Sequence, residues 1–297
     1  MNWDDKAPLL GSYAYIKTWG ERLNHFANAR LFVDSGAFTA ATLGITIDLT
    51  EYSEWLVEHK PIIYQAAGLD VIGDWRATAR NDDLMRDRIG HQVTIVPTWH
   101  IGSPESELER LCRTNTYIAI GGCVPYASRP KVLLAHLIRA HRIAREHGTR
   151  LHGLGVTGGQ TLVKLPWHTV DSSSWSQGLR YGAVKLRTQR GETQNIPINK
   201  GPLPPAKAAL VRRYDGDPAR VGSPAFFKNG PSTVEEYRRD RDWIAQSAAR
   251  STWVLADALD RTHRTGVTIY LANTAYVNLA AAMIGYTKGS PYRKGGT

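Results

Sequence analysis

The chain has 297 residues, longer than most single sandwiches or helical bundles and close to one α/β barrel of about 250 residues with insertions. Its 37 Lys and Arg residues against 27 Asp and Glu residues give a formal net charge of +10, which suits a polyanionic partner such as nucleic acid. The two cysteines, Cys112 and Cys123, are too few for a disulfide framework or a cysteine-rich metal cluster, which favours a reducing compartment.

Neither a secretory signal nor a membrane span is predicted. The first ten residues carry charges where a signal peptide needs an apolar run. The longest apolar stretch, residues 275–286, is shorter than the about 20 residues that cross a bilayer. We therefore expect a soluble, cytoplasmic protein that does not bind membranes.

Short apolar runs alternate along the chain with segments of helical periodicity. We predict strands within 31–38, 61–66, 69–74, 94–100, 117–122, 150–156 and 168–175. Most of these runs show little alternation between apolar and polar residues, which is typical of strands covered on both faces. We predict helices over 49–60, 103–114, 129–148 and 232–263. Thr50, Ser103 and Ser232 are placed to cap three of these helices, and Glu235 lies three residues after Ser232.

Strands that alternate with helices predict right-handed crossovers and a parallel sheet, here an α/β fold of the (β/α)8 TIM-barrel type. The region at about 177–231 differs in composition: between Gln177 and Lys228 ten basic residues stand against three acidic ones, and Pro and Gly are frequent. We expect one barrel domain over 1–297, with this region as an irregular basic insertion before C-terminal helices. The insertion is either a solvated loop region or a surface that contacts phosphates. The candidates for nucleic-acid contacts are Arg180, Lys185, Arg187, Arg212 and Arg213.

Two Asp-Ser pairs follow predicted strands, in VDSGAF and in VDSSSW, and place Asp34 and Asp171 where a strand opens into a loop. Active sites form at such strand ends in barrels of parallel strands. A pair of carboxylates suits chemistry at a glycosidic bond, because one attacks or stabilises the sugar while the other moves protons. For either pair alone, the alternative is a turn or a cap, since both side chains bind nearby backbone N–H groups.

Six motifs occur in a fixed order along the chain: VDSGAF, LDVIGD, IVPTWH, IAIGG, LHGLGVTG and VDSSSW. In this order they resemble the tRNA-guanine transglycosylase superfamily, most closely its phage branch, which places 7-deazaguanines in DNA. The resemblance covers roughly residues 31–182. It implies a (β/α)8 barrel and a base exchange, in which an aspartate displaces guanine and a 7-deazaguanine then takes its place on the sugar.

The resemblance also implies roles for single residues. Asp171 matches the nucleophile, and Asp34 matches the position that contacts the base and assists proton transfer. Asp74, with Asp70 as the alternative, matches an acidic residue that accepts hydrogen bonds from the guanidine-like edge of the purine. The other positions expected at the base are Ser35, Phe38, His100, Gly121 and Gly122.

Two of these positions carry further expectations. The glycine pair, Gly121 and Gly122, leaves room for the base to approach the backbone. His100 or Trp99 lies in the strand where the tRNA enzymes have a glutamine.

Stacking on an unpaired base is a further expected role, for which the candidates are Phe38, Trp99 and Trp175. His100, His152 and His168 lack metal-binding spacing, so we expect structural histidines where the site does not use them.

One departure from the resembled family concerns metal and substrate. The tRNA enzymes hold zinc through a CxCxxC segment, to which neither cysteine here belongs. We therefore predict no metal and no cofactor, DNA rather than tRNA as the polymer, and a free base such as 7-cyano-7-deazaguanine as co-substrate. A phage enzyme of this kind would act in the host cytoplasm, where DNA modification evades restriction. The alternatives are a tRNA-directed transglycosylase or related nucleoside glycosidase, and a catalytically silent nucleic-acid-binding barrel; the oligomeric state stays open.

Overall fold

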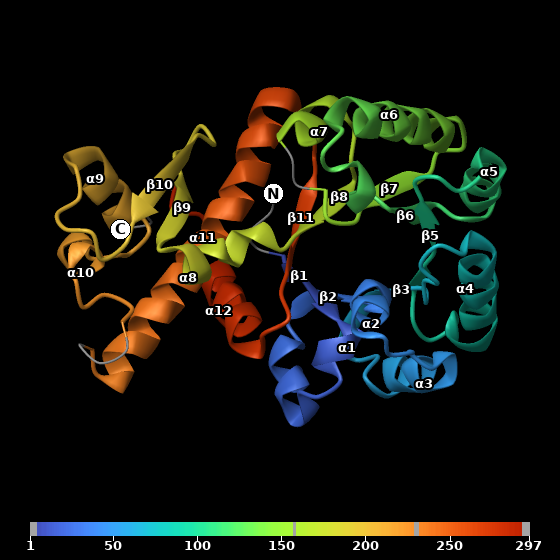
Figure 1. Cartoon of the computed structure of the whole chain (residues 1–297), viewed down its shortest axis with the longest axis horizontal. Coiled ribbons are helices and arrows are strands. Elements are labelled where there is room, and N and C mark those ends of the chain that lie inside the picture. Colours follow the sequence, from blue (N-terminus) through green and yellow to red (C-terminus); the bar gives the residue numbers. More distant parts are fainter. Residues whose placement is uncertain (1–4, 157–158, 229–231, 293–297) are drawn as a thin grey trace. The chain divides into compact units, whose positions relative to one another are not determined.

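The computed structural model describes residues 5–156, 159–228 and 232–292 and is drawn in Figure 1. The chain forms two compact units. The barrel unit comprises Pro8–Ser172 and Thr265–Tyr276, and the second unit comprises Met1–Ala7, Ser173–Arg264 and Val277–Thr297. The second unit therefore extends well beyond the insertion expected at 177–231, because it also takes in most of both C-terminal helices.

The barrel unit is a ring of parallel strands. The strands in chain order are β1 (Ala7–Ser12), β2 (Ala29–Asp34), β3 (Ile63–Ala67), β4 (Ile95–Val96), β5 (Thr98–His100), β6 (Tyr117–Gly121), β7 (Arg150–Gly153), β8 (Thr169–Ser172) and β11 (Thr268–Ala272). Their order in the sheet is β4-β3-β2-β1-β11-β8-β7-β6-β5. Since only Pro97 separates β4 from β5, these two sheet ends are halves of one strand, and the nine segments make a closed ring of eight strands. Neighbours in the ring are neighbours in sequence, so the fold is the expected (β/α)8 barrel.

Helices surround this ring, as Figure 1 shows for α3 to α6. The helices and turns of the barrel unit are α1 (Tyr13–Ile16), η1 (Gly20–Phe26), α2 (Ala37–Leu43), α3 (Leu49–Glu58), α4 (Trp75–Ile89), α5 (Glu105–Thr114), η2 (Val124–Tyr126), α6 (Pro130–Glu146) and α7 (Gly159–Lys164). The three helices predicted here are confirmed, but their caps differ. Asp48 rather than Thr50 caps α3, because its carboxylate accepts the N–H groups of Thr50 and Glu51 at 2.8 and 2.9 Å. Pro104 rather than Ser103 precedes α5.

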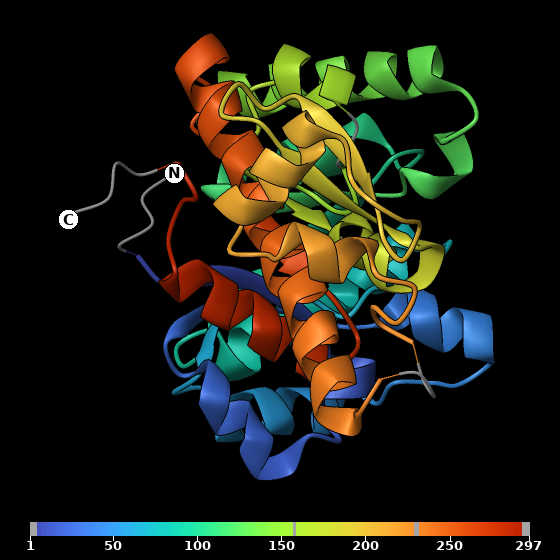
Figure 2. The ribbon, with the colours of Figure 1, turned by 90° about the vertical axis from the view of Figure 1, so that its left-hand side faces the viewer.

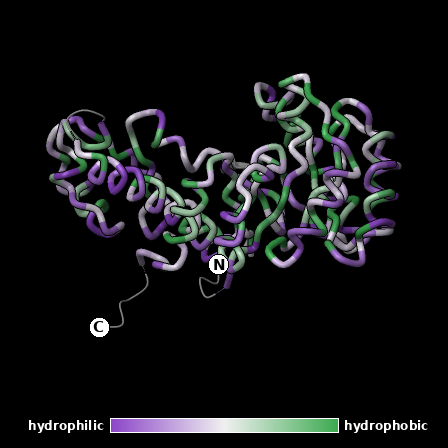
Figure 3. Tube along the Cα trace, turned by 90° about the horizontal axis from the view of Figure 1, so that it is seen from below, coloured by the Kyte–Doolittle hydropathy of each residue, from purple (hydrophilic) through white to green (hydrophobic). Residues whose placement is uncertain are grey.

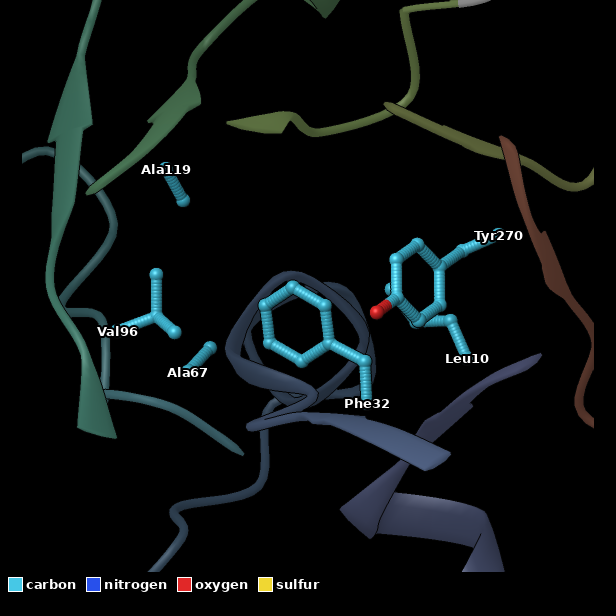
Figure 4. Close-up of a cluster of buried hydrophobic side chains, with 6 residues drawn as sticks. All are labelled: Leu10, Phe32, Ala67, Val96, Ala119 and Tyr270. Carbon is cyan, nitrogen blue, oxygen red and sulfur yellow. The ribbon is translucent and has the colours of Figure 1, made fainter. Parts of the chain in front are cut away.

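The barrel interior is filled by one side chain from each of several strands. Figure 4 shows six of them pointing toward one another: Leu10, Phe32, Ala67, Val96, Ala119 and Tyr270. Two of the six are alanines, which leave room for the rings of Phe32 and Tyr270, whose centroids lie 5.8 Å apart. This packed layer makes the barrel a solid core, so chemistry is confined to its ends.

The second unit contains regular elements where an irregular insertion was expected. Its elements are η3 (Ser174–Gln177), α8 (Gly178–Tyr181), β9 (Ala183–Arg187), β10 (Thr193–Pro197), α9 (Pro205–Arg213), α10 (Pro218–Gly222), α11 (Val234–His263) and most of α12 (Tyr276–Thr287). The hairpin β9–β10 packs against the long helix α11, as Figure 2 shows. Thr233, not Ser232, caps α11 through a reciprocal contact with Glu236, one residue later than predicted.

No helix among residues 5–156, 159–228 and 232–292 is long and apolar enough to cross a membrane. Figure 3 shows hydrophobic and hydrophilic residues interspersed along the chain.

The strand predicted at 69–74 is absent: this segment is the loop between β3 and α4. Its apolar residues Val71 and Ile72 are exposed, which explains why an apolar run alone misidentified it as a strand.

Candidate active site

The carboxyl ends of the barrel strands carry most of the expected site residues. Asp34 is the last residue of β2, His100 of β5 and Gly121 of β6, and Asp171 is the last but one of β8. Asp70 follows β3 by three residues. Because all the strands run in the same direction, these side chains share one rim of the ring, where barrel enzymes hold their active sites.

Asp34 is a carboxyl group poised to exchange protons. Burial raises its pKa to about 7, and the negative charges of Asp70 and then Asp171 contribute to the same shift. The Gly36 N–H, which donates to Asp34 Oδ2 at 3.1 Å, and the nearby Ser12 hydroxyl offset only part of it. Near neutral pH, both the protonated and the ionised forms of this carboxyl group are therefore populated.

The turn after Asp34 requires glycine. Gly36 has a φ of +82°, in the left-handed region, and a side-chain carbon there would lie 2.6 Å from Ser12 Oγ and 2.8 Å from Ala14 Cβ. The glycine thus lets the backbone fold back so that its own N–H reaches the Asp34 carboxylate. The SGA part of the first motif is explained by this turn.

Asp171 is held differently. Its side chain is buried, and Oδ1 accepts the Gly155 N–H at 2.7 Å. The imidazole Nε2 of His152 lies 3.5 Å from the same oxygen. The contacts that hold the Asp171 carboxylate in place are therefore made through Oδ1.

Asp70 and His100 form a contact pair on the same rim. His100 Nε2 lies 3.4 Å from Asp70 Oδ2. Burial alone would lower the pKa of His100, but the interaction with Asp70 outweighs it and the pKa is raised overall. A side-chain carbon at Gly121 would lie 2.8 Å from the His100 ring. At Gly121, the imidazole of His100 therefore occupies the space in which we expected a base to approach the backbone.

Asp74 lies outside this cluster. Its exposed carboxylate accepts the N–H groups of Arg76 and Ala77, each at 3.0 Å, and so caps α4. Asp70, the alternative acidic residue, is the one whose charge acts on Asp34. The structure thus places Asp70 at the site and gives Asp74 the capping role that Asp residues commonly take before a helix.

Asp82 is a site carboxyl group that the sequence analysis missed. It projects from α4 and is only 1% exposed, and its Oδ2 accepts the Thr98 N–H at 3.3 Å. Burial, followed by the charge of Asp70, holds its pKa well above the usual range. A side-chain carbon at Gly68 would overlap its Oδ1. One signal was available: Asp82 shares the buried face of α4 with Thr78, Met85 and Ile89.

The three aromatic residues proposed for stacking differ in accessibility. Phe38, in α2 just after Asp34, is 62% exposed. Trp99 is buried, and its indole N–H donates to the Pro104 carbonyl at 3.2 Å. Trp175 is buried and belongs to the second unit. Of these, Phe38 alone has a free face to offer a base.

Several polar atoms of the barrel unit are buried without a hydrogen-bond partner among the described residues. They include Ser35 Oγ, Asp70 Oδ1, Asp82 Oδ1, Thr98 Oγ1 and His152 Nε2. Buried polar groups are nearly always paired, so a group of unpaired ones marks a place where a polar ligand or water completes the hydrogen bonding. Ser35 directly follows β2 and Asp70 lies three residues after β3, so both are at the carboxyl rim of the barrel.

The basic residues proposed for nucleic-acid contact all belong to the second unit. Arg180, Lys185, Arg212 and Arg213 are exposed. Arg187 is different: its guanidinium group donates to the Ser251 carbonyl at 3.1 Å, and burial lowers its pKa. Arg187 therefore joins β9 to α11. Among the exposed four, Lys185 donates to the Gln177 side chain at 3.3 Å and Arg213 to the Pro291 carbonyl at 3.5 Å.

In the part of the chain that the structure describes, no group of three or more His, Cys, Asp or Glu side chains is arranged to hold a metal ion. Both cysteines are free, and burial raises the pKa of each thiol to about 11.

Comparison of the chain with protein-family models, with curated proteins and with solved structures gave no match. The chemistry of the barrel rim is therefore the basis for assigning a function.

Proposed function

We propose that this protein is a DNA guanine transglycosylase, which exchanges guanine in DNA for a 7-deazaguanine base through a covalent aspartyl-sugar intermediate. The observation that carries the proposal is the gathering of Asp34, Asp70 and Asp171 at the carboxyl rim of a (β/α)8 barrel, where burial and the other two charges raise the pKa of Asp34 to about 7. The six ordered motifs add the resemblance to transglycosylases and the choice of substrate.

In the first half of the reaction, Asp171 Oδ2 bonds to the sugar carbon C1′ while the bond from C1′ to guanine N9 breaks. The electron pair goes to the purine, which takes a proton from Asp34. In the second half, Asp34 accepts a proton from the incoming base, whose nitrogen bonds to C1′ as Asp171 departs. A group with a pKa near 7 serves as acid and as base with similar efficiency at neutral pH.

Base recognition is assigned to the unpaired polar atoms near Asp34. Asp70 Oδ1 is an acceptor without a partner among the described residues, which suits the N–H groups of a guanidine-like purine edge. The Ser35 hydroxyl is buried and unpaired as well. His100, held beside Asp70, supplies a donor at the position where the tRNA enzymes have a glutamine amide.

DNA as the polymer is supported by charge and by an exposed ring. The net charge of +10 and exposed basic residues of the second unit such as Arg180, Lys185, Arg212 and Arg213 suit a phosphate backbone. A base inside a duplex must leave its stack before its sugar can react, which costs a few kcal/mol, about the amount that stacking on an aromatic ring returns. Phe38, the second residue of α2 and four residues after Asp34, is our candidate for that contact.

The test is a base-exchange assay with the full chain. Labelled guanine or 7-cyano-7-deazaguanine is incubated with duplex DNA, single-stranded DNA or tRNA, beside an Asp171→Asn variant and an Asp74→Asn variant as a matched carboxylate control. Label in DNA that requires Asp171 but not Asp74 supports the proposal. Label that enters tRNA alone would show that DNA is the wrong polymer. No label in any polymer would favour a catalytically silent nucleic-acid-binding barrel.

A further inference from the structure

His152 lies inside the barrel, fully buried, on strand β7. Its register partner on β8 is Thr169, and Asp171 lies two residues further along β8 on the same face. The imidazole ring spans both side chains: Nδ1 is 2.7 Å from Thr169 Oγ1, and Nε2 is 3.5 Å from Asp171 Oδ1. The rings of Phe32 and Tyr270 pack against it, with centroids 4.9 and 6.0 Å away.

A series of hydrogen bonds leads across the barrel to Nδ1. The Gln65 side-chain amide donates to the Tyr117 hydroxyl at 3.4 Å, and that hydroxyl lies 2.6 Å from Thr169 Oγ1. Each hydroxyl has a single proton to donate. The Tyr117 oxygen accepts from Gln65, and Thr169 Oγ1 is the acceptor within reach of the Tyr117 proton. If Thr169 accepts this proton, its own proton is directed to His152 Nδ1.

This direction determines where the imidazole carries its own proton. If Nδ1 accepts from Thr169, the neutral ring is protonated at Nε2, the nitrogen that lies 3.5 Å from Asp171 Oδ1. The opposite direction would turn the Nε2 lone pair toward a carboxylate, which is electrostatically unfavourable. Nε2 has no hydrogen-bond partner among the described residues, so Asp171 is the acceptor within its reach.

We infer that His152 is a positioning residue for Asp171: the hydrogen bonds from Tyr117 and Thr169 fix its neutral Nε2–H tautomer, and this N–H stabilises the Asp171 carboxylate. The separation of 3.5 Å is long for a hydrogen bond. Catalytic hydrogen bonds are often long in the free enzyme and shorten in the complex with substrate. The catalytic part of the inference rests on the proposed function, whereas the tautomer is a property of the folded chain alone.

The contact acts most strongly in the second half of the exchange. In the covalent intermediate Asp171 is an ester, so its Oδ1 carries little charge and the donors from His152 and Gly155 have little effect. When the incoming base bonds to C1′, the bond from C1′ to Oδ2 breaks and its electron pair returns to the carboxylate. Both donors then stabilise that charge, while the His152 proton stays on Nε2. Loss of the His152 donor should therefore slow the departure of Asp171 more than its attack.

The tautomer is tested first, without any substrate. Nitrogen-15 NMR of the full chain labelled at its ten histidines distinguishes a protonated from an unprotonated ring nitrogen, and a His152→Gln variant assigns the signals. We expect Nε2 to be protonated and Nδ1 unprotonated. Thr169→Val removes the hydroxyl with little change of shape and should alter this pattern, whereas Thr169→Ser should preserve it. A proton on Nδ1, or on both nitrogens, would overturn the inference.

The catalytic consequence is tested with a matched pair of variants. His152→Leu removes the donor, and His152→Gln places an amide N–H at a similar reach. With DNA and a 7-deazaguanine, we expect His152→Leu to raise the fraction of enzyme trapped as covalent adduct about tenfold, and His152→Gln to restore most of the normal fraction. Thermal melting of both variants checks that they fold. If His152→Leu does not fold, Thr169→Val gives an independent test of the same effect on the adduct.

The two tests separate the inference from the proposed function. If no substrate is exchanged by the wild-type chain, the proposed function fails, while the NMR result still decides the tautomer. If exchange occurs and both His152→Leu and Thr169→Val leave the adduct fraction unchanged, His152 has only a structural role and the inference is wrong.

Discussion

Asp34 and Asp171 each lie at the end of a barrel strand and each precede a serine, yet their carboxyl groups have different surroundings. Asp34 accepts one N–H at 3.1 Å and faces the negative charges of Asp70 and Asp171. Asp171 accepts an N–H at 2.7 Å and has an imidazole beside it. The Asp-Ser pair therefore fixes the position of a carboxyl group on the rim, while its neighbours in space determine its charge and hydrogen bonding, on which the two roles that we propose depend.

The largest effect is expected from removing the proposed nucleophile. Asp171→Asn keeps the shape of the side chain but replaces the attacking oxygen anion, so base exchange should fall by roughly 10³-fold or more. The initial rate of label entry into DNA measures this, with Asp74→Asn as a control that removes an exposed carboxylate. Exchange at a near-normal rate in Asp171→Asn would reverse the roles assigned to the two carboxyl groups.

A smaller loss is expected at Asp34. Asp34→Asn removes the group that passes protons to and from the bases, which should slow exchange by about 10²-fold. It should leave Asp171 able to attack, so a slowly formed covalent adduct should still be detected. The dependence of the rate on pH sharpens the comparison: the wild-type profile should have an inflection near a pH of about 7, and the Asp34→Asn profile should lack it.

The same carboxyl group should affect stability. Burial and the neighbouring charges raise the pKa of Asp34 from 3.8, the value expected in the unfolded chain, to about 7. Between these pH values the folded chain binds more protons than the unfolded chain, so it loses stability as the pH rises. We expect Asp34→Asn to raise the free energy of unfolding by about 4 kcal/mol at alkaline pH, with the gain shrinking as the pH falls toward the lower value. Urea denaturation at both ends of this window measures it. An equal effect at both ends would contradict the raised pKa.

The smallest effect concerns the second unit. Replacing Arg212 and Arg213 by Glu should weaken DNA binding about tenfold and lower the slope of affinity against salt by about 2, because two phosphate contacts and their released counterions are lost. Arg142 and Arg145 on α6, replaced by Glu, provide the same change of charge on the barrel unit. If the two double variants behave alike, the effect is one of net charge and not of contacts made by α9.

Part of this site could be predicted from sequence. Asp34 and Asp171 were found because each follows an apolar run that could only be a buried strand. The long helices were found because their periodicity extends over many residues. Asp74 was preferred to Asp70 as the base-binding acid, although the structure places Asp70 beside His100 and uses Asp74 as a cap. Asp70 and Asp74 lie in the same loop, and the sequence pattern does not indicate which of the two side chains faces the barrel.

Other parts depend on contacts between distant segments. The role of His152 arises from Thr169 and Tyr117, which reach it from neighbouring strands and are far from it in sequence. Asp82 enters the site because Gly68 on another segment leaves it space. The strands β1 and β11 were not predicted, although they have six and five residues; their pairing with each other and of β11 with β8 identifies them.

The central claim is that Asp171 forms a bond to the sugar of a nucleotide in DNA. The most direct test is to trap the enzyme during turnover with duplex DNA, digest it, and locate the sugar-linked peptide by mass spectrometry. We predict a single adduct on Asp171, its absence in Asp171→Asn, and its presence in Asp34→Asn. An adduct on Asp34 or on any other residue, or full exchange without an adduct, would contradict this account.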